Sequence, residues 1–442
     1  MYNKSKKIKI LFVLAAGKLY REAVKRDNPY RYYAPTTLIQ LAALVPKYLN
    51  AEVKIVDQGC EVFSDDFNAD IIGISTITCA APEAYRIAKI ARKRGITVIM
   101  GGYHPSLNPD EALKYADSVV VGYAENTLPK LLIDYKNNKL KRLYRDTSKT
   151  LLVRMPELDR KYLSKTYFPS SSIETTRGCP NGCKFCSLPP MVKNRYWTRP
   201  VDEIINEIKT MGKNIVFLDS NHTVLKSHYL KLWKEMENLK VNWYAATTLQ
   251  FASETDNIKL IAKSGCKGLL LGFESLNQES LNTVNKKFNN VTQYKEIIKK
   301  LHDYGIGIIA CIVFGFDYDG TSIFEKTVQF VNDTKIDIIK YAILTPFPGT
   351  PLFNDFKKKN RIITEDWSLY DTLHAVYIPK KMSPYQLEQG LQWSFDETYK
   401  IKSILNRIFR RGSPLIHSTI GNVIFKRTFS NIIPNKNSRK IF

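Results

Sequence analysis

The first third of the chain alternates short apolar runs with amphipathic stretches of helical periodicity. Strands are expected at 8–16, 53–57, 71–76, 97–102 and 119–122, with helices between them at 35–49, 80–94, 109–115 and 125–135. Continuous apolar strands that alternate with helices are typical of a parallel sheet covered on both faces. The pattern therefore predicts a doubly wound α/β domain over residues 1–138, whose ligand lies at the carboxyl ends of its strands.

The loops after three of these strands supply the candidate ligand contacts of this domain. They carry Ser75 and Thr76, then Gly101, Gly102 and His104, and finally Gly122. Glycine leaves room for a flat ligand to approach the backbone. A histidine in such a loop is either a ligand contact or an ordinary turn residue, and the sequence leaves both interpretations open for His104.

A second alternation of strands and helices follows a charged, irregular stretch at 139–169, which we interpret as a linker between domains. Strands are expected at 172–178, 214–220, 242–248, 267–275, 306–316 and 337–347. Six consecutive strand–helix units predict a partial (β/α)6 barrel over 170–360, with its working residues at the carboxyl ends of the strands. The remaining residues, 361–442, are expected to form a mostly helical C-terminal region.

The composition adds a large positive charge to this picture. The chain has 442 residues, of which 66 are Lys or Arg and 42 are Asp or Glu, so its formal net charge is +24. This excess favours an anionic partner, although drift toward a Lys-rich and Asn-rich composition produces the same charge without one. No apolar run reaches the length of a bilayer span, and the basic start of the chain continues directly into a strand. We therefore expect a cytoplasmic protein.

The last 45 residues differ from the rest of the chain. Between positions 398 and 442 there are ten Lys or Arg and no Asp or Glu. Apolar residues lie beside these charges at helical spacing, namely Ile401, Ile404, Leu405, Ile408 and Phe409. This pattern fits a helix that lies in a membrane interface, or a basic tail whose apolar stripe packs on the barrel. We keep both interpretations, and with the first a peripheral location on the inner membrane face.

The strongest chemical signal is a cluster of three cysteines after the first predicted barrel strand. The chain has seven cysteines, which is not a disulfide framework, and Cys179, Cys183 and Cys186 have the spacing CxxxCxxC. Three thiolates on one tight loop can hold three irons of a cubane cluster and leave the fourth iron open. A structural zinc site needs a fourth protein ligand, and no Cys or His lies at the required spacing.

With an aromatic residue, Phe185, directly before the third cysteine, this motif resembles that of the radical S-adenosylmethionine (SAM) superfamily. The resemblance implies a 4Fe–4S cluster whose open iron binds SAM. It also implies reductive cleavage of SAM to a 5′-deoxyadenosyl radical, which abstracts hydrogen from an unreactive carbon. The barrel would shield such a radical from water. An electron donor such as a flavodoxin or ferredoxin is expected as a partner.

The same resemblance implies contacts to SAM at the other strand ends. Phe185 would lie against the adenine, and Gly272, Glu274 and Ser275 would contact the ribose and the methionine portion. Gly315 and Pro346 would frame the adenosine. Three of these residues have a simpler alternative, because an acid such as Glu274 in this turn stabilises the following helix, and Gly315 and Pro346 suit ordinary turns. Asp219, Asn221 and His222, after the second barrel strand, would contact the substrate or cap a helix.

The domain order resembles the cobalamin-binding class of radical SAM enzymes, which has a flavodoxin-like domain before the barrel. Residues 101–113 and 116–132 carry this resemblance, and 366–371 favours the group of hopanoid C-2 methylases and related lipid, isoprenoid and tetrapyrrole enzymes. Cobalamin domains that ligate cobalt carry Asp-x-His-x-x-Gly after the first strand. Residues 15–25 contain no histidine, so we expect either that cobalamin binds without a histidine ligand or that the fold persists with the cofactor lost.

The resemblance favours methyl transfer to an unactivated carbon of a lipid, an isoprenoid or another small molecule. Radical cyclisation or rearrangement without methylation is an alternative of the same class. A tRNA methylthiotransferase would need three further N-terminal cysteines, whereas only Cys60 and Cys79 precede the barrel, so a nucleic-acid partner is not expected. A sensor that keeps its cluster without turnover is the non-enzymatic alternative.

Overall fold

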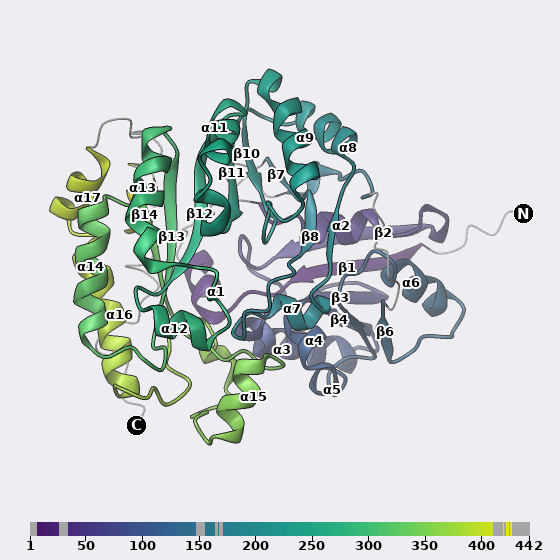
Figure 1. The fold of residues 1–442 in the computed structure, drawn as a ribbon. Coiled ribbons are helices and arrows are strands. Elements are labelled where there is room, and N and C mark those ends of the chain that lie inside the picture. The colour runs from purple at the N-terminus through teal and green to yellow at the C-terminus, as the bar shows by residue number, and fades with distance from the viewer. Residues whose placement is uncertain are drawn as a thin grey trace, which may run out of the picture.

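The computed structural model describes residues 7–25, 34–146, 155–163, 167, 171–409, 419, 421–423 and 425–426. These residues form two parallel sheets of six strands each, one in each half of the chain, and a small antiparallel hairpin. Figure 1 shows the first domain in purple and blue, with the second domain in teal and green beside it. The predicted combination of two α/β domains is confirmed.

The first sheet has the strand order β2-β1-β3-β4-β5-β6, and all its pairs are parallel. Its strands are β1 (Ile8–Leu14), β2 (Ala51–Asp57), β3 (Ile71–Ser75), β4 (Thr97–Gly101), β5 (Ser118–Val121) and β6 (Leu143–Arg145). The chain moves outward from β1 in one direction to β2 and in the other direction from β3 onward. This reversal marks the switch point at which doubly wound sheets bind ligands.

Both faces of the first sheet are buried, as the continuous apolar strands predict. Leu11 and Val13 of β1 belong to one apolar cluster, whereas Ile10 and Phe12 belong to another on the opposite face. The covering helices are α1 (Lys18–Lys25), α2 (Thr37–Ala43), α3 (Ala81–Lys93), α4 (Tyr103–Leu107), α5 (Pro109–Ala112) and α6 (Leu128–Lys136). Two 3-10 turns, η1 (Lys47–Leu49) and η2 (Thr78–Ala80), complete the domain.

The second sheet has the order β14-β13-β12-β11-β10-β7, with β7 and β14 as its two edges. Its strands are β7 (Ser172–Ile173), β10 (Asn214–Phe217), β11 (Asn242–Thr247), β12 (Cys266–Glu274), β13 (Gly307–Phe314) and β14 (Ile338–Ile343). The main helices between them are α8 (Val201–Lys209), α9 (Lys226–Met236), α11 (Thr255–Lys263), α13 (Tyr294–Asp303) and α14 (Ser322–Thr334). This open sheet with helices outside is the predicted partial barrel.

The single strand predicted at 172–178 is wrong, because the structure divides it into two. After β7, strand β8 (Thr176–Gly178) leaves the sheet and pairs antiparallel with β9 (Tyr196–Thr198). Asp219 accounts for the break, since its Oδ1 accepts hydrogen bonds from the backbone N–H groups of Thr175 and Thr176 at 2.7 and 2.8 Å. These N–H groups therefore do not donate to a neighbouring strand of the sheet.

The segment predicted as a linker begins with a strand. Residues Leu143–Arg145 form β6, which pairs with β5, so the first sheet extends past the expected boundary at residue 138. Only Tyr144 of the three residues is buried, and its hydroxyl donates to Asp134 at 2.7 Å. A strand with one buried residue has too little apolar periodicity to be predicted.

The C-terminal region spans both domains before it becomes helical. Trp367, in the turn η6 (Trp367–Leu369), packs into the core of the first domain and donates to Glu111 at 2.9 Å. Farther along, α16 (Pro384–Thr398) contacts β14 and α14, and α17 (Ile401–Ile408) follows it along the outer side of the barrel. Most of the basic tail after residue 409 lies outside the described residues.

Candidate functional site

The three cysteines lie on the loop of the β8–β9 hairpin, and all three are half-buried. The loops that follow β12 and β14 hold this loop in place. The backbone N–H of Lys184 donates to Val284 O, and Leu352 N–H donates to Lys184 O, both at 3.0 Å. Asn285 also donates from its side chain to Gly182 O at 2.9 Å. The cysteine loop is thus fixed at the carboxyl ends of the barrel strands.

Gly178, directly before Cys179, has a backbone conformation that other residues avoid. Its φ is +85°, and a Cβ atom at this position would lie 2.0 Å from the carbonyl oxygen of Arg195, the residue just before the paired strand β9. Glycine is therefore required at the point where β8 turns into the cysteine loop.

The side chains of Asp219, Asn221 and His222 lie next to the start of the cysteine loop. Besides holding the backbone of β8, Asp219 accepts from Thr175 Oγ1 and forms a 2.5 Å contact with His222 Nδ1. His222 is fully buried among Phe217 and two tryptophans. Asn221 contacts Cys179 Sγ through Nδ2 at 3.9 Å. The trio caps no helix, because α9 begins at Lys226.

The thiols of the cysteine loop lie close enough to affect one another electrostatically. Burial raises the pKa of Cys183 and raises that of Cys186 to about 11, and the neighbouring cysteines add to both shifts. Within the described ranges, no three His, Cys, Asp or Glu side chains are already arranged around a metal position. The set still fits an iron–sulfur cluster, since three sulfur donors on one loop are the ligands such a cluster takes.

Glu274 lies beside the cysteine loop and pairs with Lys286. At Glu274 the chain leaves the regular register with β13, and its φ is +63°, a strained value for a residue other than glycine. The pair folds over Gly272, where a Cβ atom would come within 2.4 Å of Glu274 Oε1. Gly272 therefore makes room for the pair.

Lys286 is a site residue that the sequence did not reveal. Its Nζ lies 6.0 Å from the ring centre of Phe185, which in turn meets Phe316 edge to face at 6.5 Å. Burial alone would lower the pKa of Lys286, but Glu274 beside it raises that pKa above the ordinary value. A lysine after a short helix looks like any surface lysine in a sequence, and only the fold brings it to the cysteines.

The other predicted SAM contacts are engaged with the protein itself. Ser275 is buried, and its hydroxyl accepts from Asn277 N–H at 3.0 Å. Gly315 has φ +98° and its carbonyl accepts a hydrogen bond from the hydroxyl of Tyr377. Pro346 is buried in the loop after β14. The structure thus brings Gly272, Glu274 and Gly315 to neighbouring strand ends near Phe185.

The residues predicted to contact cobalamin gather at the carboxyl edge of the first sheet, where Ser75 lies beside Gly101. Position 102 requires a glycine, because a Cβ atom on Gly102 would lie 2.7 Å from the carbonyl oxygen of the buried Thr76. Glycine at this position therefore lets the two loops make close contact. At Gly122, with φ +86°, a Cβ atom would meet nothing closer than 4.0 Å, so this position is open.

His104 is fully buried and held by its own domain. Its Nε2 lies 3.1 Å from Tyr85 Oη and its Nδ1 lies 3.4 Å from Thr78 Oγ1. Glu111 approaches Nε2 at 3.7 Å, and Trp367 packs against the ring edge to face. Both ring nitrogens thus have protein partners, which favours the packing interpretation of this residue.

A buried charged cluster joins the first domain to the cysteine loop. Arg177 of β8 lies 3.0 Å from Glu125 and 2.7 Å from Glu174, and it donates to Gln40 at 2.8 Å. Its guanidinium also stacks over the ring of Tyr123 at 4.7 Å. Burial alone would lower the pKa of Arg177, but the two glutamates raise it. Sequence reasoning missed this cluster, whose members lie on three separate segments of the chain.

Known proteins resemble this chain in both domains. The model of the radical SAM superfamily matches residues 173–331, and that of the B12 binding domain matches residues 41–132. The chain is 31% identical over 419 residues to the bacteriochlorophyllide d C-12(1)-methyltransferase of Chlorobaculum tepidum, covering 92% of this chain and 89% of that protein. It is 23% identical over 359 residues to the hopanoid C-2 methylase of Rhodopseudomonas palustris, covering 77% and 67%.

A solved structure has the same fold. The cobalamin-dependent SAM radical enzyme OxsB with aqua-cobalamin bound aligns with a TM-score of 0.65 at 14% identity, covering 97% of this chain and 72% of that one. A B12 binding domain joined to a radical SAM domain defines a cobalamin-dependent radical SAM enzyme. The chain belongs to the methyltransferase family of this class. The resemblance seen in the sequence is thereby confirmed, and with it the use of a 4Fe–4S cluster, SAM and cobalamin.

Proposed function

We propose that this enzyme transfers a methyl group to an unactivated carbon of a hydrophobic, polycyclic small molecule. The observation that carries this proposal is the 31% identity to a bacteriochlorophyllide methyltransferase along nearly the whole of both chains. Weaker similarity to a hopanoid methylase supports a hydrophobic polycyclic substrate in general. Between the two, the more similar relative favours a tetrapyrrole over a lipid or an isoprenoid.

Cys179, Cys183 and Cys186 are proposed as the three cluster ligands. When bound, the cluster, SAM and cobalamin supply a carbon-centred radical and an activated methyl group. The hairpin β8–β9 holds the three sulfurs on one loop, and Asp219 and Asn221 fix the base of that loop. Three sulfurs on one loop take three of the four iron positions of such a cluster, which leaves the fourth iron to SAM.

Glu274 and Lys286 are proposed to bind the amino-acid portion of SAM. A zwitterion with an ammonium and a carboxylate suits an adjacent carboxylate and ammonium pair. The flat ring of Phe185 and the backbone at Gly315, which carries no side chain, are proposed to contact the adenosine. Among the predicted contacts of cobalamin, Gly122 has room beside its backbone, since a Cβ atom there would meet nothing closer than 4.0 Å, and its N–H donates to Ser106 Oγ at 2.9 Å.

Incubation with SAM that carries a deuterated methyl group tests the proposed reaction. The reduced, anaerobically reconstituted enzyme with cobalamin would receive bacteriochlorophyllide-type tetrapyrroles and polycyclic isoprenoids as separate substrates. The proposal predicts a product that carries the deuterated methyl group. A product of cyclisation or rearrangement without the label would contradict methylation, and labelling of the isoprenoid alone would contradict the tetrapyrrole assignment.

The reaction also needs an electron donor, and we propose a flavodoxin or a ferredoxin for that role. Both are acidic proteins of small size, which suits a chain with a net charge of +24.

Among the described residues, no helix has the length and apolar character of a membrane span.

A further inference from the structure

Glu274 lies on a strained turn at the end of β12. Ser275 N–H donates to Phe273 O at 2.9 Å, which closes a γ-turn around Glu274. The φ of +63° at Glu274 belongs to the rare, strained form of this turn. Phe273 has no partner in β13, because successive residues of β13 pair with Gly272 and then with Glu274. Such a bulge redirects the side chain that follows it, and bulges and strain of this kind are frequent beside active sites.

The side chain of Asn289 holds this turn from inside the protein. It is 1% exposed, and its Nδ2 donates to Gly272 O at 2.8 Å and to Phe273 O at 3.3 Å. Tyr294, at the start of α13, is fully buried and donates from its hydroxyl to Phe273 O at 2.9 Å. The carbonyl of Phe273 thus accepts from Ser275, Asn289 and Tyr294. The turn cannot relax without breaking these buried hydrogen bonds.

The backbone of Asn289 also fixes the turn that carries Lys286. Its N–H donates to Lys286 O at 3.1 Å, and its carbonyl accepts from Gln278 Nε2 at 3.0 Å. The residues directly before Lys286 are bonded to the cysteine loop. Asn289 therefore joins the two members of the Glu274–Lys286 pair and helps to hold both beside that loop.

One atom of Asn289 has no hydrogen bond. Its Oδ1 is buried and has no partner among the residues that the structure describes. An amide oxygen left unsatisfied in the interior costs free energy. Leucine, which has a similar size, would avoid this cost but would remove the donors to Gly272 and Phe273. The donors of the amide therefore account for an asparagine at this position.

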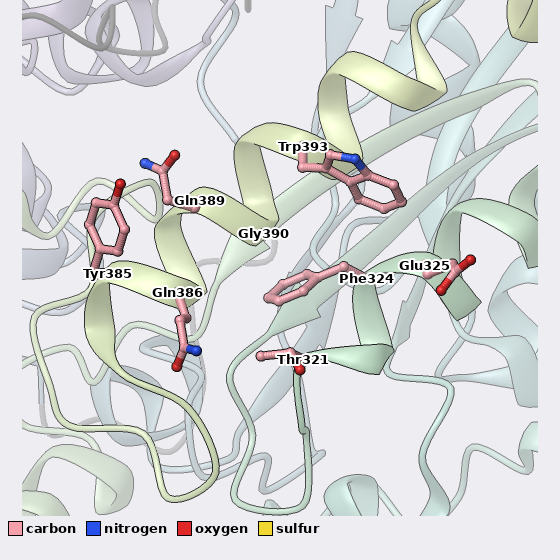
Figure 2. A pocket seen from close by; sticks show the side chains of 8 residues that line it. All are labelled: Thr321, Phe324, Glu325, Tyr385, Gln386, Gln389, Gly390 and Trp393. Atoms are coloured by element: carbon pink, nitrogen blue, oxygen red, sulfur yellow. The ribbon is translucent and has the colours of Figure 1, made fainter.

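The groove between α14 and α16, on the outer side of the barrel, has a different character. It has a volume of about 360 Å³, and Figure 2 shows Phe324 between Tyr385 and Trp393 in its lining. Glu325 also lines the groove, and no Lys or Arg of the described chain lies there with it. The groove therefore lacks the paired charges that suit the amino-acid portion of SAM.

We propose that Asn289 is a positioning residue for SAM, which holds Glu274 and Lys286 in the geometry that receives the ammonium and carboxylate of the cofactor. This inference rests on the proposed role of that pair in binding SAM. The side chain of Asn289 is buried behind the turn, so it acts through the pair and not by contact with SAM. Loss of its donors lets the strained turn relax, and the affinity for SAM falls.

Equilibrium dialysis against radiolabelled SAM tests this inference on the anaerobically reconstituted holoenzyme with its cluster oxidised, so that no turnover occurs. Asn289→Leu removes both donors and should raise the Kd for SAM about tenfold. Tyr294→Phe removes only the hydroxyl that donates to Phe273 O and should raise the Kd about threefold. Asn257→Leu is the matched control, because Asn257 of α11 is also buried and donates to a backbone carbonyl, Phe251 O, at 3.2 Å. This control should bind SAM like the wild type, even if its melting temperature falls.

The double variant Asn289→Leu with Lys286→Gln separates positioning from a general loss of stability. If Asn289 acts through the pair, its substitution should weaken SAM binding less than about threefold once Lys286 has lost its charge, because the two effects are then coupled. Iron content and melting temperature show whether each variant folds. Tyr294→Phe, the milder change, decides the test if Asn289→Leu loses its cluster.

Three results would overturn the positioning role. They are an unchanged Kd in Asn289→Leu and Tyr294→Phe, an equal loss of affinity in Asn257→Leu, and a full additional loss from Asn289→Leu in the Lys286→Gln background. The single variant Lys286→Gln distinguishes this failure from that of the proposed function. A raised Kd in Lys286→Gln alone leaves the pair at the SAM site without help from Asn289, whereas an unchanged Kd in both single variants removes the pair itself from that site.

Discussion

The phenol oxygen of Tyr123 accepts a hydrogen bond from the backbone N–H of Gly178 at 3.0 Å. Tyr123 belongs to the B12 binding domain, and Gly178 directly precedes the first cysteine of the cysteine loop. With Arg177 stacked on the same ring, this contact ties the two domains together beside the cysteines. These contacts therefore help to hold the carboxyl edge of the first sheet next to the cysteine loop.

Replacing Tyr123 by phenylalanine tests this tie. The variant Tyr123→Phe leaves the Gly178 N–H without its partner in a buried place, so the free energy of unfolding should fall by about 1–3 kcal/mol. Chemical denaturation under anaerobic conditions measures the change. Tyr48→Phe, which alters an exposed ring, serves as the control and should leave stability unchanged. Equal stability of Tyr123→Phe and the wild type would show that the contact carries no energy.

Removing any one of the three loop cysteines should abolish the cluster. Alanine at Cys179, Cys183 or Cys186 takes away one of only three sulfur ligands, and two are too few to hold a cubane. Iron analysis and the visible absorbance of anaerobically reconstituted protein measure the loss. Cys60→Ala removes a half-buried cysteine of the first domain, and this variant should keep its iron. Full iron content in a loop variant would refute the ligand assignment.

Lys286→Gln should raise the KM for SAM by about tenfold to a hundredfold, since a charge-assisted contact contributes about 1.5–3 kcal/mol. Lys286→Arg should recover part of the loss, because it restores the charge. The adjacent Lys287 is exposed, and Lys287→Gln is the matched control. An unchanged KM in Lys286→Gln, measured by 5′-deoxyadenosine formation, would remove this residue from the SAM site.

Asp319 should make the stability of the protein depend on pH. Burial raises its pKa from 3.8 to about 6, although Ser280 and the backbone N–H groups of Phe316 and Gly315 oppose the shift. The folded state then binds more protons than the unfolded state between these two values, so stability falls as pH rises through this window.

Asp319→Asn removes this titration while keeping an acceptor for the two backbone N–H groups. Relative to the wild type, the variant should gain about 1–2 kcal/mol of unfolding free energy between about pH 5 and about pH 7.5. Urea denaturation at both pH values measures this difference. Asp256→Asn, at an exposed position, should show no such change. A constant difference between variant and wild type across this range would contradict the raised pKa.

The order and type of the elements could be predicted because the period of the apolar residues is local information. Both sheets followed from it, and the cysteine loop followed from the CxxxCxxC spacing of Cys179, Cys183 and Cys186. The break in the strand after Ile173 could not be predicted, since its cause, Asp219, lies 44 residues after the Thr175 whose N–H it accepts from. Lys286, Tyr123 and Arg177 were missed for the same reason, because each acquires its role only from a partner on another segment.

His104 is a residue that the sequence did single out, as a possible cofactor contact, but that the structure buries. Its place in a loop at the carboxyl edge of the sheet suited a cofactor contact, yet α3 and the C-terminal Trp367 enclose it. Nothing in the residues around position 104 indicates that a tryptophan more than two hundred residues away covers this histidine. A loop position alone suggests an exposed side chain. Whether the side chain is exposed in the fold depends on remote segments, which the local sequence does not show.

The formation of 5′-deoxyadenosine tests the central claim most directly. Protein reconstituted without oxygen, then reduced with a strong low-potential reductant and given SAM, should release 5′-deoxyadenosine detectable by mass spectrometry, whereas Cys183→Ala should release none above background. If the iron-loaded wild type gave no 5′-deoxyadenosine, or if Cys183→Ala produced as much, the cysteine loop would not be the place where SAM is cleaved.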